Sequence, residues 1–229
     1  MKLNPIIISL LDTDFYKFNM NQVIFHKHTD AIGEYYFKCR NSNIVFTDEM
    51  VEEINAQIDH LCTLSFTDAE LEYLASLRFI KYDYVEFLRL WRPLRRYVRC
   101  FNCGGELYIE VNGPLFSAMQ FEIYLLEIVN EVYFRFQYEY EELLASARSR
   151  LEEKVKKIND GVYTFKFAEF GCRRRLSRDW QEEVISTLIK TGKCVGTSNV
   201  YLAKKLNIKP IGTYAHEFVQ MYQGISKIP

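Results

Sequence analysis

The amino-acid sequence predicts an α/β protein made of two regions, residues 1–112 and residues 113–229. The last third of the chain alternates short apolar strands with amphipathic helices in the order β-α-β-α-β, a pattern typical of neighbouring parallel strands. The first half places helices around a β-hairpin. Gly113-Pro114 is the clearest break between these two patterns, because glycine and proline interrupt regular elements.

The composition is that of a folded globular chain. Apolar residues make up 48% of the 229 residues and charged residues 26%, which supplies a substantial core and excludes a mainly disordered state. The net charge is −1, whereas nucleic-acid-binding proteins usually carry an excess of positive charge. We therefore expect no nucleic-acid partner.

Two features of the sequence favour a cytoplasmic protein without a membrane partner. The apolar run from Ile6 to Leu11 is too short to cross a membrane and leads into Asp12 rather than into a signal-peptide cleavage site. The six cysteines are scattered, as in proteins with reduced thiols. Only Cys100 and Cys103 form a CxxC pair, and without a second half-site we expect no metal site.

Caps and turn residues delimit the elements of the first region. Thr67 and Glu70 form a capping box, and the segment 102–105 suits the turn of a hairpin. Apolar and polar residues alternate from Leu107 to Val111, as they do in a half-buried strand. The expected elements are helices over residues 15–27 and 47–64 and after Thr67, and strands over residues 31–39, 97–101 and 107–111.

The second region begins with two expected helices and continues with the β-α-β-α-β pattern. Ser177 is a suitable N-cap for a helix that ends at Gly192. A further helix contains Leu202 and Leu206. The remaining expected elements are helices over residues 116–134 and 138–158 and strands over residues 163–170, 193–195 and 209–211.

Glycine and polar residues follow each of the three expected parallel strands. These segments are Phe170-Gly171-Cys172-Arg173-Arg174-Arg175, Gly196-Thr197-Ser198-Asn199 and Gly212-Thr213-Tyr214-Ala215-His216. Each segment alone is compatible with an ordinary role: a core phenylalanine beside solvated arginines, a helix cap and a structural histidine. Ligands of parallel α/β folds bind at this edge of the sheet, so the shared position favours a ligand site.

Five ordered segments of the sequence resemble the nicotinate phosphoribosyltransferase family. They are Leu-Leu-Asp-Thr-Asp-Phe-Tyr-Lys (10–17), Gly-Pro-Leu-Phe (113–116) with Glu-Val-Tyr-Phe-Arg (131–135), Glu-Phe-Gly-Cys-Arg-Arg-Arg-Leu-Ser-Arg (169–178), Val-Gly-Thr-Ser-Asn (195–199) and Ile-Gly-Thr-Tyr-Ala-His-Glu (211–217). The segments follow the order of the family and span nearly the whole chain. The resemblance implies an N-terminal α/β sandwich-like domain followed by the first βα units of an irregular α/β barrel.

The resemblance also implies a reaction. Nicotinate and phosphoribosyl pyrophosphate would give nicotinate mononucleotide and pyrophosphate, coupled to ATP hydrolysis, in NAD salvage. The implied partners are nicotinate, phosphoribosyl pyrophosphate and ATP, with Mg²⁺ expected beside phosphoribosyl pyrophosphate. Members of the family generally act as homodimers with a shared active site.

The resemblance further implies roles for individual side chains. Phe170 would stack on the pyridine ring, and Tyr16 of a partner subunit would cover the other face. Arg173 would contact the anionic substrates, Thr213 would help to hold nicotinate, and His216 would be the histidine that ATP phosphorylates. An aromatic sandwich orients a flat ring, and fixed positive charge stabilises a departing pyrophosphate.

Ser198 bears on the choice of substrate. Relatives that use nicotinamide have an aspartate at the matching position, which accepts a hydrogen bond from the amide and would repel a carboxylate. The neutral serine therefore favours nicotinate, and nicotinamide phosphoribosyltransferase is the less favoured alternative. Glu169 and Cys172 stand where aspartate and threonine are commoner in the family, and we expect little effect from either.

The length of the chain departs from the family pattern. The later barrel strands and the loops that grip the 5′-phosphate in the family have no counterpart before Pro229. We expect a fragment of a longer enzyme. The alternative is a catalytically inactive ligand-binding or dimerisation module of the same ancestry.

Overall fold

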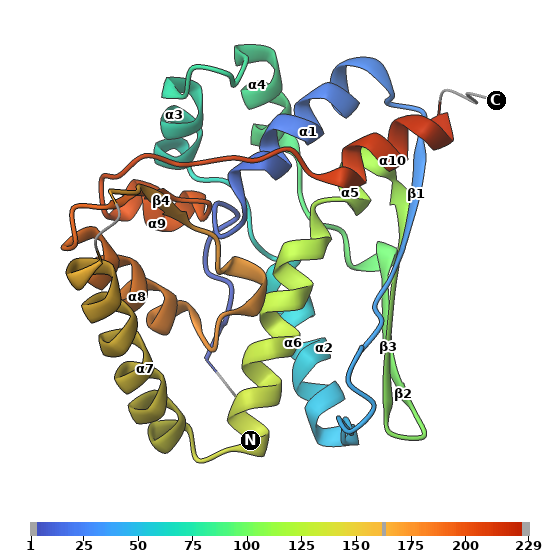
Figure 1. The fold of residues 1–229 in the computed structure, drawn as a ribbon. Coiled ribbons are helices and arrows are strands. Elements are labelled where there is room, and N and C mark those ends of the chain that lie inside the picture. Colours follow the sequence, from blue (N-terminus) through green and yellow to red (C-terminus); the bar gives the residue numbers. More distant parts are fainter. Residues whose placement is uncertain (1–3, 162–163, 226–229) are drawn as a thin grey trace.

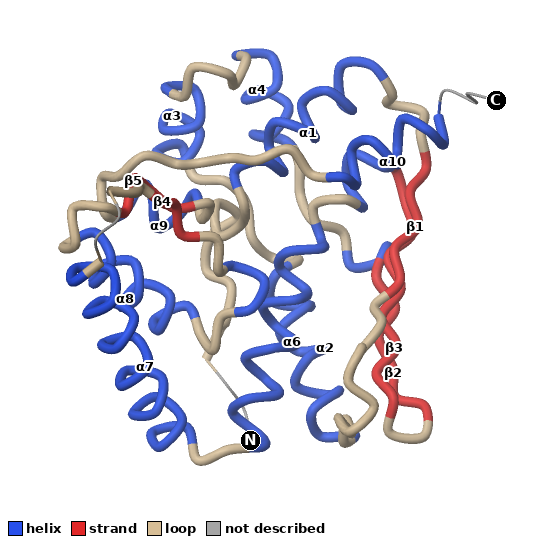
Figure 2. The backbone as a smooth tube through the Cα atoms, viewed as in Figure 1, coloured by secondary structure: helices blue, strands red, loops and turns tan. Residues whose placement is uncertain are grey.

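The structure, a computed structural model that describes residues 4–161 and 164–225, consists of helices packed with two small β-sheets, of which the antiparallel one lies at the edge of the molecule (Figures 1 and 2). The helices are α1 (Phe15–Lys27), α2 (Asp48–Leu61), α3 (Asp68–Ser76), α4 (Tyr82–Leu90), α5 (Leu115–Ala118), α6 (Phe121–Gln137), α7 (Tyr140–Asp160), α8 (Arg178–Ile189), α9 (Val200–Lys205) and α10 (His216–Ile225). The strands are β1 (Ile32–Tyr36), β2 (Val98–Cys103), β3 (Glu106–Pro114), β4 (Phe167–Glu169) and β5 (Cys194–Thr197). Two 3-10 turns, η1 (Arg95–Tyr97) and η2 (Cys172–Arg174), complete the described elements.

The first sheet is antiparallel, with the strand order β1-β3-β2. The expected hairpin is confirmed, and it turns at Gly104 and Gly105, whose φ angles of 63° and 88° suit glycine. Leu107, Ile109 and Val111 of β3 all point into the core, as the alternation predicts. The sheet packs against the central helix α6 and stands beside α2 (Figure 1).

The second sheet consists of the parallel pair β4–β5. The expected third parallel strand over residues 209–211 is wrong as a full strand, because the structure contains only an isolated parallel bridge between Thr197 and Pro210. Proline has no N–H to extend a ladder. Thr197 N donates to Lys209 O at 3.3 Å, and Ile211 N donates to Thr197 O at 2.8 Å, so the segment still lies against β5.

Gly196 allows that close approach. A Cβ atom at this position would collide with the carbonyl oxygen of Lys209 and press on Ile211. Glycine is the residue that lets two backbones come this near. From there an extended segment crosses the molecule to α10, which lies near β1 and α5 (Figure 1).

Several elements differ in extent from the sequence prediction. The predicted helix over 116–134 is two helices, because the chain breaks between α5 and α6 at Met119 and Gln120. Helices α4 and α10 have no counterpart in the prediction. The strand expected over residues 163–170 is confirmed only over Phe167–Glu169, and its Tyr163 lies outside the described residues. The capping box of Thr67 and Glu70 is confirmed, as is the Ser177 cap, whose hydroxyl accepts from Trp180 N.

The main core extends across the predicted boundary at residue 113. It contains Ile6 and Leu10 from the N-terminal segment, Ile109 from β3, Ile128 from α6 and Val200 from α9. Gly113 and Pro114 pair with β1 as the last residues of β3. The division into 1–112 and 113–229 stays a prediction, but the described chain buries one main apolar core on both sides of it.

Within the described ranges, none of the helices is both long enough and apolar enough to cross a membrane.

Candidate functional site

The start of α1 is the meeting point of the segments that follow the parallel strands. Phe15 N donates to Ser198 O at 2.8 Å, and Asp14 forms an antiparallel bridge with Asn199. A Cβ atom on Gly212 would lie 3.4 Å from the Phe15 ring and 3.7 Å from Tyr16 N. The N-terminal motif, the end of β5 and the segment before α10 therefore adjoin one another, although they are far apart in sequence.

Ser198 occupies a buried position between β4 and α1. Its N–H donates to Glu169 O at 2.9 Å, which fixes its backbone to the end of β4. Its hydroxyl is fully buried and has no hydrogen-bond partner among the described residues, and the same is true of Thr13 Oγ1 and Asp14 Oδ1. A buried polar atom without a partner is costly, and such atoms frequently mark a place where a ligand or water binds. The Ser198 hydroxyl is free to donate to a carboxylate.

Phe170 follows β4 and exposes 45% of its surface. It lines a cavity of about 580 Å³ that lies between α7, α8 and the end of β4. Apolar side chains such as Leu151 and Trp180 contribute to the lining, together with the cationic Arg150 and Lys154. An exposed ring beside such a cavity is available for stacking on a flat ligand.

The three arginines after Phe170 have different environments. Arg173 and Arg174 are exposed, but the Arg175 side chain is buried and bonds both oxygens of Asp12, at 2.7 and 2.9 Å. Arg175 Nη2 also lies 3.2 Å from Glu127. This bidentate pair ties the N-terminal segment to the region of β4, so Arg175 is structural, and the selection of Arg173 for the site fits its exposure.

A buried lysine connects Arg173 with the helix that begins at His216. Lys17 Nζ lies 2.5 Å from Glu122 Oε2 of α6 and 2.6 Å from Glu217 Oε2 of α10. Glu122 Oε1 in turn accepts from Arg173 Nη1 at 3.1 Å, and Glu217 Oε1 accepts from the Tyr35 hydroxyl at 2.8 Å. Burial would raise the pKa of Glu122, but Lys17 and Arg173 outweigh it and hold that pKa below its ordinary value.

Tyr16 is buried in its own chain, with 3% of its surface exposed. Its ring packs in a small cluster with Met20 and Met119, against which Phe218 and Met221 of α10 also pack. Burial, followed by the neighbouring Asp14 carboxylate, raises the pKa of the Tyr16 hydroxyl, which stays protonated at neutral pH. The role of Tyr16 toward a partner subunit stays a prediction, and it requires the Tyr16 ring to leave this cluster.

Thr213 and His216 are both exposed to solvent. Thr213 lies in the extended segment before α10, and His216 is the first residue of that helix. The structure thus brings Tyr16, Arg173 and His216 to the neighbourhood of Lys17, and brings Ser198 to the start of α1. Phe170 directly follows Glu169, whose carbonyl oxygen accepts the hydrogen bond from Ser198 N.

In residues 4–161 and 164–225, no three His, Cys, Asp or Glu side chains gather as a protein-held metal ion would require. A Mg²⁺ ion that accompanies a diphosphate is held largely by phosphate oxygens and water, so the expectation of Mg²⁺ stays a prediction.

Comparison with known families identifies the chain. The profile described as the nicotinate phosphoribosyltransferase (NAPRTase) N-terminal domain matches residues 11–130, which is 120 of the 229 residues, and the profile of the NAPRTase family matches residues 165–228. The chain belongs to the nicotinate phosphoribosyltransferase family. Residues 165–228 include every strand-end segment of the site.

Relatives and solved structures of nicotinate phosphoribosyltransferases agree with this assignment. The chain is 45% identical over 234 residues to the nicotinate phosphoribosyltransferase of Chromobacterium violaceum, and 46% identical over 233 residues to that of Neisseria gonorrhoeae. These alignments cover 98% and 97% of this chain but 58% of each relative. The crystal structure of the Porphyromonas gingivalis nicotinate phosphoribosyltransferase has a TM-score of 0.84 at 31% identity, with 96% of this chain and 57% of that chain covered. For the Vibrio cholerae structure the TM-score is 0.86 at 30% identity, with coverages of 97% and 56%.

Sequence reasoning missed three charged residues of the candidate site that surround Arg173 and His216, namely Lys17, Glu122 and Glu217. A signal for Lys17 was present in the sequence, because helical spacing places it on one face with the apolar Met20 and Ile24. A lysine on a buried face requires a carboxylate partner. Nothing local to Glu122 or Glu217 identifies them as that partner, since both reach it from helices distant in sequence.

Proposed function

We propose that this chain supplies the nicotinate-binding and phosphoryl-accepting part of a nicotinate phosphoribosyltransferase. In the proposed reaction, the pyridine nitrogen of nicotinate forms a bond with C1 of phosphoribosyl pyrophosphate while pyrophosphate leaves with the electrons of the broken C–O bond. The products are nicotinate mononucleotide and pyrophosphate, and ATP hydrolysis accompanies the transfer. The observation that supports this function most is the meeting of the three family segments at the start of α1.

The side chains of the strand-end segments suit an aromatic anion. Phe170 offers a stacking surface, and the unpartnered Ser198 hydroxyl is a donor for the nicotinate carboxylate. Thr213 offers a second hydroxyl from the segment that crosses α1. Holding the ring in one orientation aims its nitrogen at the ribose carbon and removes most of the entropic barrier to attack.

Arg173 is suited to the departing pyrophosphate. One of its Nη atoms bonds Glu122, and a guanidinium has five N–H donors, so most of them remain available to phosphate oxygens. Positive charge fixed before the reaction stabilises the charge that develops on the leaving group. When present, Mg²⁺ would neutralise further charge on the same diphosphate.

His216 is proposed as the residue that ATP phosphorylates. Its imidazole is exposed at the beginning of α10, where a neutral ring nitrogen can attack the γ-phosphorus while ADP leaves. The test is incubation of the chain with γ-labelled ATP. We expect acid-labile label on His216 that is absent from His216→Ala and retained in the control His26→Ala, whose histidine lies on α1 beside Asp83.

A folded chain without label on His216 would instead favour the binding-module alternative. Nicotinate binding by such an unlabelled chain would then support the ligand-binding module. Phe170→Ala should weaken that binding at least about tenfold, as loss of a stacked ring does, while Phe165→Ala, which removes a similarly exposed ring, should not.

Ser198 tests the choice between nicotinate and nicotinamide. Ser198→Asp places a carboxylate beside the ligand and should weaken nicotinate binding at least about tenfold, since like charges in a site of low dielectric repel. Ser198→Asn is the matched neutral control of similar size. Equal nicotinate affinity in both variants would remove the proposed basis of specificity.

The shared site of a homodimer belongs to the same proposal. Tyr16 would then leave its cluster with α10 and cover a nicotinate held by the partner subunit.

A further inference from the structure

The Lys17 side chain stands between the two residues proposed to act on phosphate groups. It is completely buried, yet it carries a charge, and the described residues that neutralise it are Glu122 and Glu217. Glu122 also bonds Arg173, while Glu217 directly follows His216 in the chain. A continuous series of ion pairs therefore connects Arg173 with the first turn of α10.

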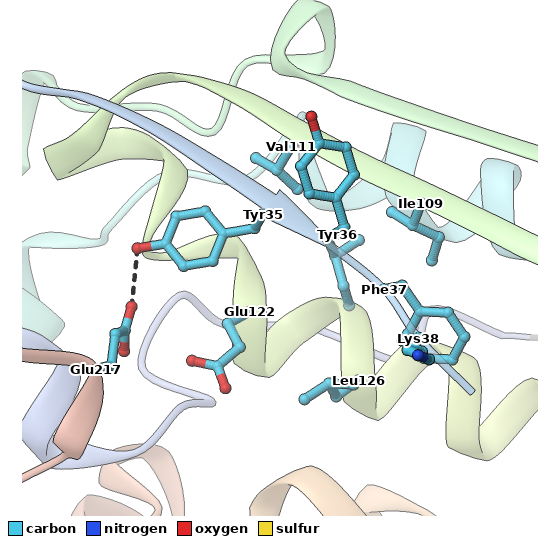
Figure 3. A pocket seen from close by; sticks show the side chains of 10 residues that line it. Tyr35, Tyr36, Phe37, Lys38, Ile109, Val111, Glu122, Leu126 and Glu217 are labelled. Carbon is cyan, nitrogen blue, oxygen red and sulfur yellow. Dashed lines mark hydrogen bonds between the residues drawn. The ribbon is translucent and has the colours of Figure 1, made fainter. Parts of the chain in front are cut away.

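Glu217 is held on both of its oxygens. Oε2 accepts from Lys17 at 2.6 Å. Oε1 accepts from the Tyr35 hydroxyl at 2.8 Å, a bond that Figure 3 shows. Two hydrogen bonds from different elements, α1 and β1, fix both the position and the rotation of a carboxylate. Because Glu217 and His216 are consecutive residues, the same bonds restrict the backbone that presents the imidazole.

On the side that faces the antiparallel sheet, the Glu122 and Glu217 carboxylates border a cavity rather than packed side chains. A cavity of about 320 Å³ adjoins Glu122 and Glu217 there, lined largely by apolar side chains such as Phe37 and Ile109 (Figure 3). Since empty space borders the two carboxylates, their orientation depends on their hydrogen-bond partners.

We propose that Lys17 is a positioning residue, which holds the first turn of α10 with His216 on one side and the Arg173 guanidinium on the other through its two glutamate partners. This inference rests on the proposed function for the roles of His216 and Arg173. Lys17 does not itself touch a substrate in this proposal. It sets where the phosphoryl acceptor stands relative to the charge that binds phosphate.

The first test is hydrogen exchange in Lys17→Met, which keeps the length of the side chain and removes the charge. The control is Lys27→Met, on the exposed last residue of the same helix. We expect amides of α10 to exchange at least about tenfold faster in Lys17→Met, since a buried ion pair that loses one partner is strongly destabilised, while amides of α2 change little. Equal acceleration in α10 and α2 would show a merely structural lysine and overturn the proposal, as would unchanged exchange in α10.

The second test measures label transfer from ATP to His216 at saturating ATP. We expect Lys17→Met to lower the maximal rate at least about tenfold at an unchanged half-saturating ATP concentration, because misplacement of a reacting group lowers the rate rather than the binding. An unchanged rate in a labelled chain overturns the proposal. If the unmodified chain takes no label, the proposed function of His216 fails and the exchange experiment still decides the role of Lys17.

A variant of Glu217 covers the case in which Lys17→Met does not fold. Glu217→Gln keeps an acceptor for Tyr35 and removes the charge opposite Lys17, and the residue is only partly buried. Faster exchange confined to α10 supports the proposal, and exchange equal to that of the unmodified chain overturns it.

Discussion

At the scale of single residues, identical side chains in one run have opposite roles. The exposed Arg173 bonds Glu122 through one Nη atom, whereas the buried Arg175 donates to Asp12 and Gln181 in the interior. Burial decides the difference, because a buried guanidinium is tolerated only when carboxylates and other acceptors surround it. The sequence run alone does not reveal which arginine turns inward.

Arg175→Met should therefore lower the free energy of unfolding by about 3–5 kcal/mol, the usual cost when a buried ion pair loses one partner. The Asp12 carboxylate would remain buried without its cation. Urea denaturation measures the change, and Arg174→Met, at an exposed neighbour without an ion pair in the described structure, should stay within about 0.5 kcal/mol of the parent. Similar losses in both variants would contradict the structural role of Arg175.

Because the Glu169 carboxyl is buried, we predict that the free energy of unfolding depends on pH. Burial raises the pKa of Glu169, although hydrogen bonds from Thr197 and Gln181 oppose the shift. The folded state then binds more protons than the unfolded state above about pH 4.5, so the free energy of unfolding falls as pH rises through the raised pKa. Glu169→Gln should flatten this decline in urea denaturation series at several pH values, and the exposed Glu153→Gln should leave it unchanged. If the free energy of unfolding of Glu169→Gln falls with pH as steeply as that of the parent, other titrating groups cause the decline.

At the scale of elements, the sequence was sufficient to predict the features whose hydrogen bonds join neighbours in sequence. The Thr67–Glu70 capping box and the Gly104-Gly105 hairpin were predictable because neighbours in sequence make their hydrogen bonds. The break between α5 and α6 was not, since the apolar run continues through it. The prediction of a third parallel strand was wrong because Pro210 has no N–H, so its segment forms a single bridge with β5 instead of a ladder.

Gly196→Ala tests the contact that replaces that strand. The new methyl group would meet the Lys209 carbonyl, and the overpacking should cost about 1–3 kcal/mol and release residues 209–211 from β5. Thermal or urea denaturation gives the cost, and hydrogen exchange of the Ile211 amide, which donates to Thr197 O, reports the release. Gly224→Ala is the matched control, because its site in α10 is open and the change should be neutral or stabilising. Unchanged protection of the Ile211 amide in Gly196→Ala would refute the account.

At the scale of the whole molecule, the candidate site depends on contacts between distant segments. The strand-end motifs predicted that a site exists at one edge, and the structure places the edge against the start of α1. The burial of Tyr16 and the ion pairs of Lys17 could not be predicted, because α10 and α6 form them from far along the chain. Periodicity describes a single element and carries no information on which element will cover it.

Because the main core joins both predicted regions, we expect residues 1–112 alone to lack a cooperative unfolding transition. That fragment ends within β3 and loses Ile128 and the rest of α6 from its core. Circular dichroism during urea denaturation compares it with residues 1–229, for which a steep transition is expected. A steep transition in the fragment would establish the first region as an independent domain.

The bond between Asp12 and Arg175 has a consequence for the order of events during synthesis. Its two residues are 163 positions apart, and at a translation rate of about 5–20 residues per second the carboxylate precedes its cation by roughly ten to thirty seconds. During that interval the nascent N-terminal segment cannot bury Asp12 as a charged group without cost. The segment around Asp12 leaves the ribosome well before Arg175 but is thus among the last to be locked into place, and chaperones have that interval in which to bind its apolar residues Ile6 to Leu11.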